Sequence, residues 1–308
     1  MLKYTIKRVF LIVPVIIGIT LFIYLVLAFA PGDPASLLLG PDATPEQLQE
    51  MRSELGLDQH VLLRYVSYMT NVLQGNFGSS WITGNSVFEE FQQRAPNTFI
   101  LSFMALIFTA VFSILFGLIA AVKQNSLVDN LTLVFALILS SIPFFWFGML
   151  MQILFALHLG WFPSMGAGTL RHFILPAISF GVANMAGQIR MVRSSMLDVL
   201  NQDYVRTAHA KGARNITVIF RHVVRNGLLP VVTNLGIIFA ISFGGAIVTE
   251  TVFSIPGIGV LMINATRTRD VPVVMGVIIF VAVFVAIVNL IVDLIYAVID
   301  PRVKLGYK

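Results

Sequence analysis

The chain has 308 residues, of which 57% are hydrophobic and only 11% are charged, and its formal net charge is +5. Soluble domains carry about 25% charged residues, so this composition excludes a soluble protein and predicts a membrane protein. The chain has no cysteine, which excludes a disulfide scaffold, thiolate zinc sites, iron–sulfur clusters and a cysteine nucleophile.

Six long apolar segments predict an all-α, polytopic membrane protein with six transmembrane helices, organised as one transmembrane domain over residues 1–308. A helix of about 20 apolar residues crosses the hydrocarbon core of a bilayer. The fourth segment contains Pro176 and reaches its full length only if the Arg190 side chain extends its charge to the interface. The expected spans are 9–30, 99–122, 131–157, 173–195, 227–249 and 271–298.

The first apolar segment follows a basic tail at 1–8, as the core of a cleaved signal peptide would. Its apolar run exceeds the about 7–15 residues of such a core. Pro-Gly-Asp-Pro at 31–34 also stands where a small-residue cleavage site would be expected. We therefore expect a retained helix.

The distribution of basic residues sets the expected orientation. One side of the expected spans, which includes the tails 1–8 and 299–308, holds 14 of the 20 Lys and Arg residues. Cytoplasmic loops of membrane proteins carry the excess of basic residues. Both termini are therefore expected in the cytoplasm.

The polar segment at 31–98 is expected to form helices outside the membrane. A capping-box pattern at 44–47, with proline at the first helical position, predicts a helix start, and Gly56 predicts its end. A second helix is expected at 61–73, and Pro96 is expected to end a later short helix. The acidic residues here favour a solvated cap, and a docking surface for an external partner is the alternative.

The loop at 196–226 predicts a rigid cytoplasmic projection. A helix is expected from about 198 to 211, ended by Gly212 in a left-handed turn, and Asn215 is expected to cap a second helix. The alternative is an amphipathic segment lying on anionic lipid. The tight turn at Gly212 favours a projection that binds in a cleft of a partner protein over a segment that lies on lipid.

Seven stretches in a fixed order cover nearly the whole chain and match one known family. They are PGDP (31–34), LGLDQ (55–59), SIPFFWFGM (141–149), RSSMLDVLNQDYVRTAHAKG (193–212), RNGLLPVVT (225–233), GGAIVTETVFSIPGIG (244–259) and NLIVDLIYAVIDPR (289–302). With them the chain resembles ABC-importer permeases, and more narrowly the dipeptide/oligopeptide/nickel permease family. The fourth stretch resembles the EAA loop of these permeases, although Thr207, beside Ala208, replaces the glutamate that names the loop.

The resemblance implies a type I ABC importer permease fold in the bacterial inner membrane. It implies four kinds of partner: a homologous second permease subunit in a heterodimer, two ATP-binding subunits, an extracytoplasmic solute-binding protein and membrane lipid. It also implies that the projection couples ATPase closure to alternating access. The residues that this assigns to coupling are Asp203, Tyr204, Arg206, Thr207, Ala208, Lys211 and Gly212.

The chain itself contains no phosphate-binding loop, no HExxH pair and no GxSxG elbow. No histidine pair has the spacing of metal ligands. We therefore expect a subunit that is not an enzyme and binds no cofactor, metal or nucleic acid, while ATP and Mg are used by the partner subunits.

Polar residues within the expected spans are candidates for the substrate pathway, because such residues are costly in lipid. Amide side chains suit a peptide backbone. For each residue singly, bonding between helices is the favoured alternative, and for Glu250 a peptide amino terminus and an outer-gate contact are equally favoured. The candidates are Asn184, Gln188, Asn234, Ser242, Glu250 and Asn289.

The predicted function is the transmembrane permease subunit of an ATP-driven importer of dipeptides or oligopeptides. Import of nickel, nickel chelates or glutathione by the same fold is the alternative. An ion-coupled secondary transporter is a distant one, because it would require mid-membrane ionisable residues and an internal repeat, and neither is evident. A membrane scaffold would not account for the cytoplasmic projection.

Overall fold

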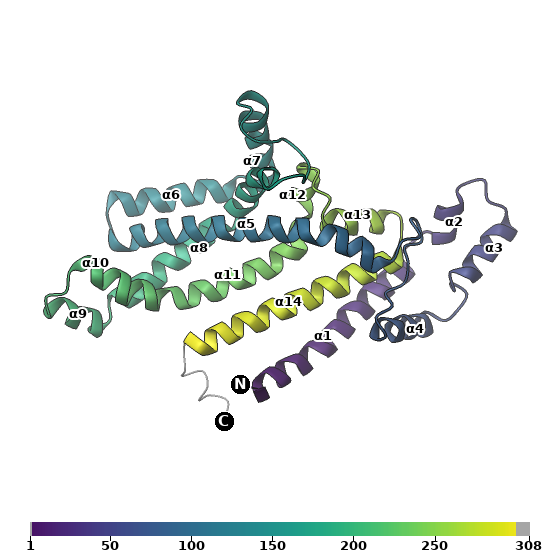
Figure 1. Cartoon of the computed structure of the whole chain (residues 1–308), viewed down its shortest axis with the longest axis horizontal. Helices are drawn as coiled ribbons and strands as arrows, with labels where there is room; N and C mark the ends of the chain where they lie inside the picture. Colours follow the sequence, from purple (N-terminus) through teal and green to yellow (C-terminus); the bar gives the residue numbers. More distant parts are fainter. Residues whose placement is uncertain (1, 300–308) are drawn as a thin grey trace. The chain divides into compact units, whose positions relative to one another are not determined.

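The computed structural model describes residues 2–299, which fold almost entirely into helices (Figure 1). Within these residues there is no β-strand, only an isolated antiparallel bridge between Ser79 and Ser86. The chain divides into two compact units. Unit 1 comprises Met1–Asn97 and Pro256–Ala286, and unit 2 comprises Thr98–Ile255 and Ile287–Lys308.

Unit 1 contains five complete helices and the starts of two long ones. The complete helices are α1 (Leu2–Phe29), α2 (Pro34–Leu39), α3 (Pro45–Glu54), α4 (Val61–Leu73) and α13 (Ile258–Arg267). The long helices, α5 (Val87–Val122) and α14 (Val271–Ile299), continue into unit 2.

The remaining helices belong to unit 2. They are α6 (Leu127–Ser141), α7 (Phe144–Met151), the π-helix η1 (Gln152–His158), the 3₁₀-helix η2 (Leu170–Phe173), α8 (Ile174–Leu200), α9 (Asp203–Ala210), α10 (Asn215–Val218), the π-helix η3 (Ile219–Val224), α11 (Arg225–Gly245) and α12 (Ile247–Val252).

Four helical stretches of the described residues are long and apolar enough to cross a membrane. They are Phe10–Phe29, Val87–Val122, Asn215–Gly244 and Val271–Val292. The pair Leu127–Ser141 and Phe144–His158 would supply a fifth span, although its two halves are bent by 92°. Helix α8 is not among these stretches.

The third expected span, 131–157, is therefore not one straight helix. Proline disfavours helical conformation in the residue before it and cannot donate a helical hydrogen bond. Ile142 is accordingly extended, with φ −85° and ψ 125°, and Pro143 precedes the first residue of α7. The bend lies at this Ile-Pro pair.

Two further boundaries differ from those expected. Helix α1 begins at Leu2, so residues 2–8 of the expected tail are already helical, whereas most of the tail 299–308 lies outside the described residues. Pro96 does not end a helix but lies inside α5. A proline removes one bond of this 36-residue helix, while buried residues on either side, Val87 and Leu101, hold the flanking turns.

In unit 1, α4 is tied to α1 by a buried tyrosine. The Tyr65 hydroxyl donates to the Ile17 carbonyl at 3.1 Å and lies 2.9 Å from the Thr20 hydroxyl. The rings of Tyr24 and Tyr65 are 5.5 Å apart. The capping box at 44–47 is confirmed, and α4 has the bounds expected from the sequence.

In unit 2, α8 packs against α6, α7 and α11 and forms the centre of the core. Its buried residues include Met185, Ile189 and Val192. The approach of α5 requires glycine at 181, because a Cβ there would lie 2.7 Å from the Phe108 ring. Close packing of this kind is typical of helices in membranes.

Candidate functional site

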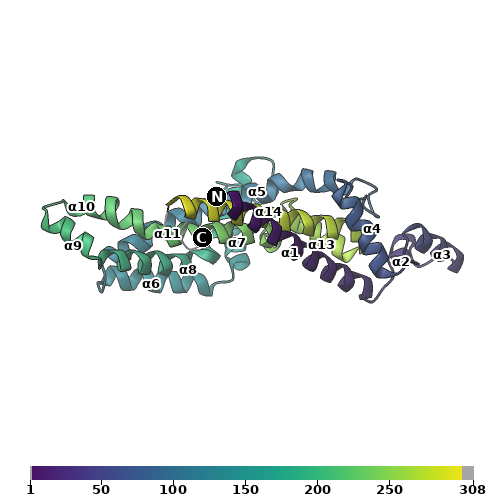
Figure 2. The ribbon, with the colours of Figure 1, turned by 90° about the horizontal axis from the view of Figure 1, so that it is seen from below.

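In the segment 201–224, helices α9 and α10 project from unit 2 beyond the ends of α6 and α8, as both Figure 1 and Figure 2 show, while η3 packs against α8. The helix expected from 198 to 211 is in fact two helices. Helix α8 ends at Leu200, and Gln202 is extended, with φ −76° and ψ 147°, as the N-cap of α9. The chain therefore turns before the coupling residues rather than only after them.

The corner after α9 is made by Gly212 in the left-handed conformation, with φ +77°. This confirms the expected glycine turn, which only glycine adopts without strain. The cap of the next helix is Arg214 rather than Asn215, which is its first helical residue. Instead, Asn215 Oδ1 lies 3.2 Å from His209 Nε2, so its side chain links the two short helices.

Buried valines anchor the segment to the rest of unit 2. Val205 on α9, Val218 on α10 and Val223 on η3 are almost fully buried in one cluster with Met196 of α8. Valine side chains carry few rotamers, so their burial fixes the backbone at little entropic cost. The segment is therefore a rigid projection rather than a loose loop.

The residues expected to couple to the ATPase lie on the solvent side of this anchor. All of them are exposed except Ala208, which is half-buried. The one ion pair on α9, Arg206 with Asp203 at 3.9 Å, is long and exposed, so it restrains neither side chain strongly. The Thr207 hydroxyl donates to the Asp203 carbonyl at 2.8 Å, so its donor is used within α9.

Two apolar side chains on the same projection are exposed rather than buried. Ile216 is 64% exposed and Phe220 is 61% exposed, next to the half-exposed Tyr204. The π-helical turns of η3 change the angular spacing from Ile219 onward, so the position of Phe220 does not follow a 3.6-residue period. No signal in the sequence marks this π-helix.

Among the pathway candidates, the described structure joins Gln188 and Asn234. Asn234 Nδ2 donates to Gln188 Oε1 at 2.6 Å, and Gln188 Nε2 donates to the Val231 carbonyl at 3.2 Å. These bonds connect α8 to α11. The pair therefore has the geometry of an interhelical contact, which was the favoured alternative for each residue.

The other pathway candidates have different surroundings. Glu250 is completely buried and accepts a hydrogen bond from the Thr98 hydroxyl at 2.5 Å. Ser242 is buried, Asn184 is half-buried and Asn289 is exposed. Unlike the coupling residues, these side chains do not share one face of one element.

One buried ion pair was missed from the sequence. Arg193 on α8 donates twice to Asp129 on α6, with both N–O distances at 2.7 Å, and the Asp129 side chain is only 2% exposed. Arg193 was counted only as a basic cytoplasmic residue. Ser126 accepts from the Asp129 backbone N–H, so a capping pattern marked the start of α6 but not the distant partner of its aspartate.

Metal binding finds no support in the geometry of residues 2–299. No group of three His, Cys, Asp or Glu side chains in this part of the chain is placed to hold an ion. The arrangement offers instead a rigid polar projection and a helical core that contains a few buried polar contacts.

Two family descriptions match the chain. "Binding-protein-dependent transport system inner membrane component" matches residues 113–305, and the N-terminal domain of the same family matches residues 1–102. Similar proteins include the glutathione transport system permease protein GsiC of Salmonella typhimurium, 38% identical over 304 residues, which are 99% of each chain. The oligopeptide transport system permease protein AppB of Bacillus subtilis is 38% identical over 315 residues, covering 99% of this chain and all of AppB.

Among solved structures, the fold resembles a chain of the MetNI methionine ABC transporter in inward-facing form. The TM-score is 0.58 at 15% identity, over 69% of this chain and 97% of that one. The family resemblance seen in the sequence is thereby confirmed. The chain belongs to the family of binding-protein-dependent transport system inner membrane components, the permeases of ABC importers.

Proposed function

We propose that the chain forms one half of the translocation pathway of an importer for short peptides. The observation that carries this proposal is the full-length similarity to permeases named for oligopeptide and for glutathione transport, each at 38% identity. Glutathione is itself a small peptide, so one pathway chemistry serves both cargoes. The proposed partners are a homologous permease, two ATP-binding subunits and an external binding protein.

For the membrane topology we propose six spans. They are the four apolar helices, the bent pair α6–α7 taken as one span, and α8. Helix α8 has 27 residues, about 40 Å at 1.5 Å per residue, and packs at the core of unit 2, where its polar residues find partners. Both termini then lie in the cytoplasm, and the polar segment from 31 to about 98 lies outside.

The orientation is tested directly because the chain has no cysteine of its own. Single variants Thr207→Cys and Asp42→Cys place one thiol on each proposed side. A membrane-impermeant maleimide added to intact cells is expected to label the variant at 42 and to spare the one at 207 until the membrane is opened. The reverse pattern would overturn the orientation.

We further propose that α9 and the Gly212 turn contact an ATP-binding subunit. Two observations support this contact: Val205 of α9 is buried against unit 2, and the coupling side chains of α9 are exposed. Because α9 is held in this way, a movement of the bound ATP-binding subunit would move α8 and α11 together with α9 as rigid bodies. The exposed Ile216 and Phe220 add apolar area to the same surface. ATP chemistry belongs to the partner, and this subunit supplies the mechanical connection.

The decisive experiment is Gly212→Val in the reconstituted importer. A β-branched residue strongly disfavours positive φ, so the corner must rearrange, although the space around position 212 is open. Peptide uptake is expected to fall at least about tenfold, which corresponds to about 1.4 kcal/mol of lost coupling. ATP hydrolysis is expected to continue without uptake.

Gly160→Val provides the matched control. Gly160 also has positive φ, +65°, and open space around it, but it lies outside the 201–224 segment. A wild-type ratio of uptake to hydrolysis in the Gly212 variant, or an equal loss in both variants, would contradict the coupling role.

For the pathway, the proposal keeps Asn184, Ser242, Glu250 and Asn289 as candidates and assigns Gln188 with Asn234 to helix contact. Uptake of a dipeptide by Asn289→Leu and Asn184→Leu, compared with that by the double variant Gln188→Leu/Asn234→Leu, tests this division. Pathway residues are expected to change the KM or the rate of uptake without changing stability.

A further inference from the structure

Helix α4 carries more apolar surface than unit 1 covers. One side of it is buried, where Tyr65 packs in a cluster with Tyr24 of α1 and Met275 of α14. Beside this buried side lie four apolar residues whose side chains are between 49% and 85% exposed. We call them the α4 stripe: Leu62, Leu63, Val66 and Leu73. Single exposed apolar residues are common on protein surfaces, but four on one short helix need an explanation.

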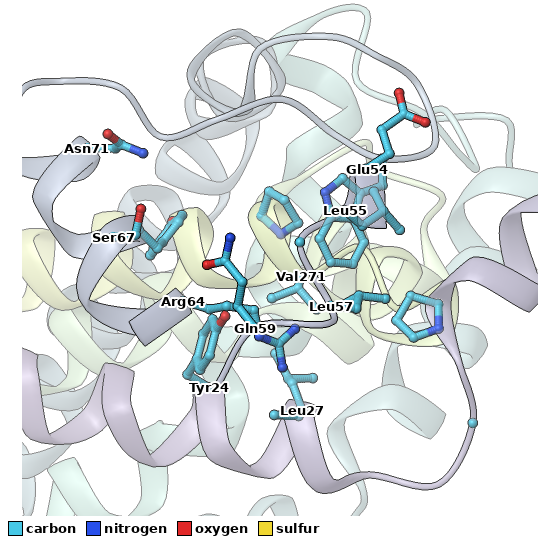
Figure 3. Close-up of a pocket in the computed structure, with 17 residues that line it drawn as sticks. Tyr24, Leu27, Glu54, Leu55, Leu57, Gln59, Arg64, Ser67, Asn71 and Val271 are labelled. Carbon is cyan, nitrogen blue, oxygen red and sulfur yellow. The ribbon is translucent and has the colours of Figure 1, made fainter. Parts of the chain in front are cut away.

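The α4 stripe is continuous with the buried side of the helix. At about 100° per residue, its four positions fall within an arc of about 100° that borders the buried side. Thr70 lies within this arc, and its hydroxyl donates to the Val66 carbonyl at 2.8 Å, so it needs no outside partner. The remaining arc is polar, with Arg64, Ser67 and Asn71 on one wall of a pocket in unit 1 (Figure 3).

The position of α4 along α1 places the stripe at membrane depth. The Tyr65 hydroxyl lies 2.9 Å from the Thr20 hydroxyl, and the rings of Tyr65 and Tyr24 are 5.5 Å apart. Thr20 and Tyr24 precede Phe29, the last residue of the first apolar stretch, by about 14 and 8 Å at 1.5 Å per residue. Figures 1 and 2 both show α4 beside the C-terminal half of α1. Half of the hydrocarbon core is about 15 Å thick, so α4 lies at the level of one leaflet.

The composition of α4 suits the boundary between lipid and water. Its single charged residue, Arg64, lies on the polar arc. With 13 residues, or about 20 Å, the helix is too short to cross a core of about 30 Å. Polar residues flank it on both sides, at 58–60 and at 74–76. Helices with this distribution lie in the plane of the interface with their apolar side among the acyl chains, and tyrosine is enriched at the same level.

We propose that α4 is an interfacial helix whose stripe inserts into the outer leaflet, so that lipid acyl chains cover it while the polar arc faces water. In this position α4 holds the outer segment against the membrane. The inference goes beyond the proposed function, in which the segment from 31 to about 98 lies wholly outside. It takes from the proposed topology only which leaflet is the outer one. A neighbouring protein is the competing occupant, and the test separates the two.

Because the chain has no cysteine, single cysteines can carry a nitroxide label at chosen positions. Leu63→Cys and Val66→Cys report on the stripe, and Asn71→Cys, at an exposed residue of the same helix, is the matched control. The labelled subunit is assembled with cysteine-free partner subunits in phosphatidylethanolamine–phosphatidylglycerol liposomes, without the external binding protein. Electron paramagnetic resonance then measures the accessibility of each label to oxygen and to nickel ethylenediaminediacetate.

Oxygen concentrates in hydrocarbon, whereas the nickel complex stays in water. The ratio of oxygen to nickel accessibility is therefore expected to be at least about fivefold higher at positions 63 and 66 than at 71. Phe22→Cys, at a 66% exposed residue of α1, supplies the lipid reference and should match the stripe. Both stripe residues are exposed, so labelling leaves the packing of α4 intact, and either variant alone decides the question.

Three outcomes would overturn the inference. Labels at 63 and 66 that the nickel complex reaches, while the label at 22 stays in lipid, would place α4 in water and leave the proposed topology standing. Low accessibility to both reagents at 63 and 66 would assign the stripe to a protein neighbour. A label at 22 that the nickel complex reaches would contradict the proposed topology of α1 and the inference together.

Discussion

The two units of the molecule use charged and amide side chains in different ways. In unit 1 the charged contacts lie near loops: the pair between Arg52 and Asp33 is half-exposed, whereas Glu90, paired with Arg94, and Asp270, which accepts from Ser80, are buried. In unit 2 the corresponding contacts are buried between long helices, as between Asp129 and Arg193. The exception in unit 2 is α9, where charged side chains are left exposed.

This difference predicts which mutations of charged residues should lower the stability of each unit. Half-exposed ion pairs contribute little to stability, whereas breaking a buried pair leaves an uncompensated charge. Unit 2 should therefore depend on its buried contacts between long helices, while unit 1 should tolerate the loss of the half-exposed pair of Arg52 and Asp33. The exposed charges of α9 should matter for partner binding and not for folding.

The largest effect is expected from Asp129→Ala. It leaves the Arg193 guanidinium facing α6 without its carboxylate, which should lower the free energy of unfolding by about 3–5 kcal/mol. Denaturant titration of the detergent-solubilised protein measures this. Asp203→Ala, at a fully exposed aspartate, is the control and should leave stability unchanged. A stable Asp129 variant would remove the contrast between the units.

A smaller effect is expected from Gln188→Leu. The change removes both hydrogen bonds that Gln188 makes to α11, with Asn234 and with the Val231 carbonyl, and each such bond in a membrane protein contributes about 1 kcal/mol. A double-mutant cycle with Asn234→Leu measures the interaction free energy between the two side chains. Asn289→Leu, at an exposed amide of α14, should show no such coupling with Gln188→Leu. Additive effects in the cycle at 188 and 234 would show that this contact does not stabilise unit 2.

The smallest effect is expected from Arg52→Gln in unit 1. The Arg52 side chain is 43% exposed, so its pair with Asp33 should contribute about 0–1 kcal/mol. The same unfolding titration, repeated at high salt, should show no further decrease in the free energy of unfolding of the variant, because salt screens a pair that the variant already lacks. A loss comparable to that of Asp129→Ala would mean that this half-exposed pair stabilises the protein as strongly as the buried pair of unit 2.

Much of the fold could be predicted from the composition and from the residues that begin and end helices. Apolar length marked the four long apolar helices, and local chemistry located the capping box at 44–47, the helix at 61–73 and the turn at Gly212. These features depend on neighbouring residues, so they can be predicted locally. Pro143 carried the signal for the 92° bend, but an unbroken apolar run concealed it.

The candidate site was predictable only in part, for the same physical reason. The exposed side chains of α9 follow from their own short helix. The partners of Asp129, Gln188 and Glu250 come from helices distant in sequence, and no local pattern specifies them. The pocket of about 340 Å³ in unit 1 that Arg64 and Trp81 help to line (Figure 3) depends on the space that neighbouring side chains leave unfilled, which only packing decides.

The buried pair of Asp129 and Arg193 also constrains how the chain is made. The two residues are 64 positions apart, and synthesis at about 5–20 residues per second separates them by roughly 3–13 s. During that interval the start of α6 carries a carboxylate without its partner. On the proposed six-span topology, α6 should therefore wait at the membrane surface or beside the insertion machinery until α8 arrives, so the two helices enter the bilayer together.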